Sequence, residues 1–144
     1  MTKEDRGHYA KKHAPGEKAN KEIAEAVKKR AVDGQMACAL AFDIAADQGA
    51  TPGQVGFALD VLEIRLTKCQ LGLFGYGAKK KIIKTAETVP GELEESIRKG
   101  LTDDRLSCKA AWDIASTFGV GKLTVSSACE TLAIKISPCQ LGAF

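Results

Sequence analysis

The sequence predicts a mainly α-helical protein made of two tandem three-helix copies, each of which ends in a short extended strand. Two observations predict this fold class. Residues 22–74 align with residues 92–144 without a gap, at an offset of 70 positions. Within both segments, apolar residues recur three and four positions apart, which is the spacing of a helix with one buried face. We call these segments the first repeat and the second repeat.

Both repeats close on nearly the same phrase, CQLGLF at 69–74 and CQLGAF at 139–144. A segment of this length buries little apolar surface by itself, so we expect the repeats to pack on each other or on a second chain. The predicted organisation is a basic flexible tail (1–21), the first repeat (22–74), a basic linker (75–91) and the second repeat (92–144).

The first two helices of each repeat are predicted from spacing and from glycine. EIAEAVKKRAV, from residue 22, and ELEESIRKGLT, from residue 92, carry apolar residues on one helical face. The next helices, MACALAFDIAADQG and LSCKAAWDIASTFG, end in Gly49 and Gly119. Glycine readily adopts the left-handed conformation that stops a helix, so both helices are expected to end there.

A third helix and a strand complete each repeat. Thr51 and Pro52 predict a helix start, because threonine caps the free amides and proline suits the first helical position. After the third helix, IRLT and IKIS alternate and are rich in branched residues, which predicts strands. We expect these strands to pair with each other, or at least to lie side by side, across a pseudo-two-fold axis. The side chains expected in the shared core are those of Ile64, Leu66, Ile134 and Ile136.

The stretch AAWDIASTFGVGKLTVSSACE, residues 110–130, resembles the helix-turn-helix motif of the DNA-binding superfamily. A small residue, Ala115, stands where two helices cross closely, and Gly119 stands at the turn. The first repeat matches at Ala45 and Gly49 but differs at Gln48, where the pattern prefers a larger apolar side chain. The resemblance implies a tandem DNA-binding protein that acts as a transcriptional regulator.

Contacts to double-stranded DNA are expected from the third helices and from the linker. Hydroxyl, amide and basic side chains suit phosphate and base-edge contacts. The net charge of +3 arises outside the repeats, and the linker stretch AKKKIIK is its focus. The residues predicted to contact DNA are Gln54, Lys122, Thr124, Ser126, Ser127, Lys79, Lys80, Lys81 and Lys84. If both third helices enter successive major grooves, they should lie about 34 Å apart.

The alternative is a non-enzymatic protein-interaction module or a homodimer. In the first repeat, the outward positions of the third helix include Phe57 and Val61 beside Asp60. Two apolar groups and an acid suit a protein partner better than a phosphate backbone.

A cysteine-based metal or redox sensor is the third interpretation. The repeat aligns Cys38 with Cys108 and Cys69 with Cys139, which gives four candidate ligands. Their spacing lacks the close pairs that usually begin zinc or iron–sulfur sites, and cysteines beside apolar neighbours are usually small buried hydrophobes. We therefore expect no metal or other cofactor. The sequence contains no combination of nucleophile, base and orienting group, so we expect no enzymatic activity.

The location expected from the sequence is cytoplasmic. The first residues lack the apolar core of a signal peptide, and no stretch approaches the length of a membrane span. No membrane partner is therefore expected.

Overall fold

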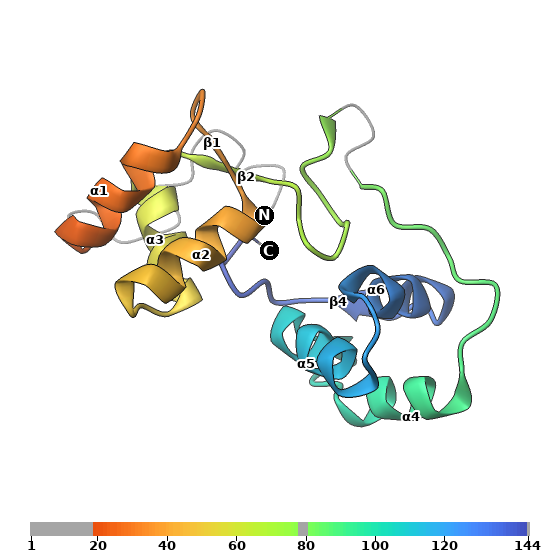
Figure 1. Cartoon of the computed structure of the whole chain (residues 1–144). Coiled ribbons are helices and arrows are strands. Elements are labelled where there is room, and N and C mark those ends of the chain that lie inside the picture. Colours follow the sequence, from red (N-terminus) through yellow and green to blue (C-terminus); the bar gives the residue numbers. More distant parts are fainter. Residues whose placement is uncertain (1–18, 78–80, 144) are drawn as a thin grey trace. The chain divides into compact units, whose positions relative to one another are not determined.

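The computed structural model describes residues 19–77 and 81–143, which form a mainly helical protein with a few short strands (Figure 1). The predicted flexibility of the tail concerns residues that lie largely outside this range. The chain divides into two compact units. Of the described residues, the first unit holds 19–69 and 140–143, and the second holds 70–77 and 81–139.

Three helices, α1 (Lys21–Arg30), α2 (Cys38–Gln48) and α3 (Pro52–Val61), build the first unit. The Asn20 side chain begins α1 by accepting hydrogen bonds from the backbone amides of Glu22 and Ile23, at 2.9 and 3.2 Å. These bonds satisfy amides that have no partner inside the helix.

The predicted stop and start around the turn between α2 and α3 are confirmed. Gly49 ends α2 in the left-handed conformation, with φ 61°. Thr51 then caps α3 by accepting from the Gln54 amide, while the Gln54 side chain accepts from the Thr51 amide. This reciprocal capping box fixes the direction in which α3 leaves the turn.

The second unit repeats this order of elements. Its helices are α4 (Gly91–Lys99), α5 (Cys108–Phe118) and α6 (Lys122–Thr131). Gly119 ends α5 with φ 63°, close to the value at Gly49. Equivalent turns also share unusual backbone angles, since Glu63 and Ala133 have φ 56° and 57°.

Each unit also contains two short parallel strands. In the first, β1 (Gln35–Ala37) pairs with β2 (Arg65–Thr67), with Met36 opposite Leu66. In the second, β3 (Arg105–Leu106) pairs with β4 (Lys135–Ile136). The strands predicted after the third helices are therefore confirmed as β2 and β4, whereas β1 and β3 were not predicted.

The predicted pairing of the two terminal strands with each other is wrong. Each sheet in the described part of the chain has two strands, and β2 and β4 lie in different sheets. The physical reason is that each terminal strand pairs along one edge with a short strand of its own unit, β1 or β3, which the sequence did not reveal. Three of the four residues expected in a shared core, Ile64, Leu66 and Ile136, are buried, whereas Ile134 is half-buried.

The core of each unit is formed by the inner faces of its helices together with the closing phrase. Val27, Val55 and Leu59 are buried in the first unit, and Ile97 and Val125 in the second. Leu71 and Leu141, from the two closing phrases, are also buried. Leu141 belongs to the first unit and Leu71 to the second, so each phrase completes the unit formed by the helices of the other repeat.

The left-handed turn at Gly119 can be tested by Gly119→Ala. The substitution should destabilise the protein by about 1 kcal/mol, because a Cβ is disfavoured at positive φ. Chemical denaturation measures the change. Gly91→Ala at the start of α4 is the control, since φ there is not positive and a Cβ meets no atom within 4 Å. Equal stability of the Gly119→Ala and parent chains would contradict the account.

Candidate interaction surface

The helix α6 is the one that the resemblance assigned to DNA. It follows α5 through the turn at Gly119 and begins after Gly121. Its inner face is packed into the second unit through Val125, Ala128 and Cys129. Its outer face is therefore what remains for a ligand.

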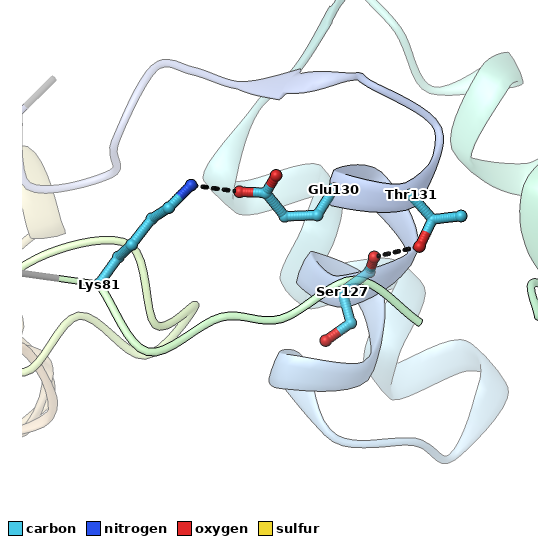
Figure 2. A network of polar contacts seen from close by, with 4 residues as sticks. All are labelled: Lys81, Ser127, Glu130 and Thr131. Atoms are coloured by element: carbon cyan, nitrogen blue, oxygen red, sulfur yellow. Dashed lines mark hydrogen bonds and ion pairs between the residues drawn. The ribbon is translucent and has the colours of Figure 1, made fainter. Parts of the chain in front are cut away.

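A segment of the linker, residues 81–86, lies on this outer face, and we call it the strap. Lys81 Nζ lies 2.7 Å from Glu130 Oε1 on α6 (Figure 2). The backbone amide of Ala86 donates to the Thr131 hydroxyl at 2.7 Å. That hydroxyl also lies within hydrogen-bonding distance of two carbonyl oxygens, 3.0 Å from Ala86 and 3.2 Å from Ser127. The strap is thus attached at both of its ends.

The strap is also bound to the closing phrase of the first repeat. The Gly72 carbonyl accepts from the backbone amides of Ile82 and Ile83, at 2.9 and 3.3 Å. A Cβ at Gly72 would lie 2.9 Å from Leu123 Cδ2 and 3.2 Å from Ile82 Cγ1. Because φ at Gly72 is 72°, a side chain would be both strained and crowded there. Gly72 therefore lets the phrase and the strap approach the first turn of α6.

Two residues of α6 predicted to contact DNA have other surroundings. The prediction that Ser126 faces outward is wrong, because this residue is fully buried, with 0% of its surface exposed. Its position on the helix points it inward beside Val125. Lys122 Nζ lies 4.4 Å from the centre of the Trp112 ring on α5, a cation–π contact. Thr124 is exposed.

The remaining predicted DNA contacts are scattered. Ser127 is half-buried, Lys81 is paired with Glu130, and Lys84 is exposed. The Gln54 side chain belongs to the capping box of α3. Lys79 and Lys80 lie outside the described residues. Among the described candidates that lie outside α6, Lys81 is the one that an ion pair joins to this helix. Its partner is the carboxylate of Glu130.

The two residues predicted for a protein partner lie on α3. Phe57 and Val61 are half-buried. The α3 sequence contains Asp60 and neither lysine nor arginine. Apolar groups beside one acid therefore border the outer face of this helix.

The four cysteines that the repeat aligns lie in buried or half-buried positions. Cys38, Cys69 and Cys108 are buried, and Cys139 is half-buried. Within residues 19–77 and 81–143, no three histidine, cysteine or acidic side chains gather in a way that could hold a metal ion.

The fifth cysteine, Cys129, lies on α6 and has no aligned partner. Burial, reinforced by the charge of Glu130, raises the pKa of Cys129 to about 11. This thiol therefore stays protonated at neutral pH, whereas metal binding and nucleophilic attack require thiolate.

Sequence reasoning missed the strap. Its contact to α6 joins residues far apart in the chain, so no local pattern shows it. The signal that could have revealed it is the Ile82–Ile83 pair, which is an apolar interruption of a basic stretch.

Comparison of the chain with protein-family models, with curated proteins and with solved structures gives no match. Among the described residues, no helix has the length and apolar character needed to cross a membrane.

Burial of the Ser126 hydroxyl predicts a stabilising substitution. Its oxygen is buried and has no hydrogen-bond partner among the described residues, and leaving such a group unsatisfied costs about 1–3 kcal/mol. Ser126→Ala should therefore raise the free energy of unfolding by about 1 kcal/mol. Ser127→Ala, one residue further along α6, is the control and should have a smaller effect. A lower stability of Ser126→Ala would mean that the hydroxyl has a partner.

The raised pKa of Cys129 predicts slow alkylation. At pH 8 to 9, iodoacetamide should modify Cys129 far more slowly than Cys139, because only thiolate reacts and because Cys129 is 1% exposed. Mass spectrometry of the digested protein measures both sites. Equal alkylation rates of Cys129 and Cys139 in the folded protein would contradict the burial and raised pKa of Cys129.

The same rise in the pKa of Cys129 predicts that the free energy of unfolding falls as pH rises above the ordinary cysteine pKa, since the unfolded chain then loses a proton that the folded chain keeps.

Proposed function

We propose that the protein is a non-enzymatic protein-interaction module, in which the third helices hold extended polypeptide segments. The observation that carries this proposal is the strap on α6. Contacts at Glu130 and Thr131 hold residues 81–86 on this face. The face that a helix-turn-helix protein would turn toward DNA is here a surface that binds peptide.

The charge of the third helices supports this proposal. A DNA-binding surface needs several cations, because neutralising phosphates supplies most of the affinity. The α3 sequence has one acid and no base, and α6 has one lysine and one glutamate. The lysine, Lys122, lies over Trp112. Neither helix therefore presents a set of cations to a phosphate backbone.

Exposed apolar side chains at the beginning of α6 give further support. Leu123 in its first turn is 43% exposed, and Val120 just before the helix is 37% exposed. Ile82 of the strap, which borders Gly72 together with Leu123, is 40% exposed. Apolar groups in this arrangement suit contact with another polypeptide.

DNA binding in transcriptional regulation is the second candidate. The order of α5, a left-handed glycine and α6 favours it, because this order is that of a helix-turn-helix motif. On this interpretation, Thr124 at the beginning of α6 and Lys84 of the strap would contact phosphate. Both residues are exposed.

A mobility-shift experiment at low salt separates the two candidates. We expect any retardation of random duplexes to be equal for the parent chain and for Thr124→Asp, because α6 is not the contact surface. Thr117→Asp, at an exposed position near the end of α5, adds the same charge and is the control. Retardation that weakens with salt and is lost in Thr124→Asp alone would overturn the protein-interaction proposal in favour of DNA binding.

A further inference from the structure

The closing phrases are exchanged between the two units. Residues 140–143 end the second repeat but belong to the first unit, and residues 70–77 follow the first repeat's strand but belong to the second unit. The phrases are CQLGLF and CQLGAF. Each unit therefore accepts a segment of nearly the same sequence from the other repeat, as a binding site accepts a ligand.

The acceptor surface in the first unit is the middle of α3. Gly56 is buried there, and a Cβ at this position would overlap the carbonyl group of Leu141. Glycine inside a helix costs about 1 kcal/mol relative to alanine. The close approach of the Leu141 backbone supplies a physical reason for a glycine at this position. Leu141 is 2% exposed, so the segment is packed into the first unit and does not lie loosely on its surface.

The rest of α3 does not need a bare backbone. Gly53, one turn before Gly56, has room for a Cβ, whose nearest neighbour would be Thr51 Oγ1 at 3.8 Å. The requirement for glycine is thus limited to the point where Leu141 crosses the helix. This difference provides a matched pair of substitutions on one helix.

We infer that the α3 surface around Gly56 binds residues 140–143 of a second copy of this chain as well as its own. The inference rests on the proposed function, in which third helices hold extended segments. A segment that leaves one chain and enters another makes the same contacts in both cases, so the exchanged dimer loses no interaction and costs only association entropy. Residues 140–143 follow β4 and contain no helix, so the exchange does not require a helix to unfold.

The first test is the mass of the full-length chain by light scattering from micromolar to millimolar concentration. We expect a dimer to form as concentration rises, both for the parent and for Gly53→Ala. Gly56→Ala should remain a monomer, because the new Cβ blocks the segment of either chain. Chains that stay monomeric throughout, or a dimer that Gly56→Ala does not weaken, would overturn the inference.

The second test measures the acceptor surface without relying on the dimer. A labelled peptide of residues 134–144 is titrated into full-length Leu141→Asp, whose own segment no longer occupies α3. This chain should bind the peptide about tenfold or more tightly than the parent, in which the site is already filled. Adding Gly56→Ala should abolish binding, whereas adding Gly53→Ala should not. If Leu141→Asp lacks the parent's helical circular dichroism, the light-scattering comparison decides alone.

The two proposals fail in different ways. Loss of duplex retardation in Thr124→Asp alone contradicts the proposed function, whatever the mass of the chain. Absence of both the dimer and the peptide complex, with no such DNA binding, contradicts only the exchange between chains. Equal peptide binding by the Gly56→Ala and Gly53→Ala forms of Leu141→Asp would also contradict it.

Discussion

The passage of the Leu141 backbone across the bare face of α3 at Gly56 is the constraint on which the first unit depends. No other residue type fits at position 56 without moving the segment, because even one added carbon meets the Leu141 carbonyl. The segment in turn places Leu141 among the buried residues of that unit. A phrase at the end of the second repeat is thereby part of the core formed by the first. Neither unit therefore consists of a single contiguous repeat.

Local features of the fold could be predicted from the sequence because they depend on neighbouring residues. Gly49 and Gly119 end helices because glycine, which has no Cβ, readily adopts the left-handed conformation, and the Thr51 side chain caps the start of α3. Strands β1 and β3 could not be predicted, since they are too short to show alternation. Because β1 and β3 were not predicted, the terminal strands β2 and β4 had no evident partners in the sequence, and the prediction paired them with each other.

The interaction surface was less predictable, because its contacts join distant parts of the chain. Helical periodicity predicted that Ser126 faces outward, although this residue is buried. Its equivalent in the first repeat is Gly56, and this replacement of glycine by serine was the one visible sign that position 126 is crowded. The contact of Lys81 with Glu130 leaves no local pattern. The charge of the linker suggested contacts with phosphate, whereas its Lys81 meets the carboxylate of Glu130 on α6.

The outer face of α6 holds a peptide segment, the strap, and amide hydrogen exchange in the full-length chain tests this assignment most directly. Ile82 and Ala86 donate their amides to Gly72 and Thr131. If the strap occupies the face, these two amides should exchange slowly, with protection approaching that of the α6 backbone, whereas an unattached linker exchanges at the rate of a free peptide. Exchange of both amides at the free-peptide rate, while α6 remains protected, would contradict the account.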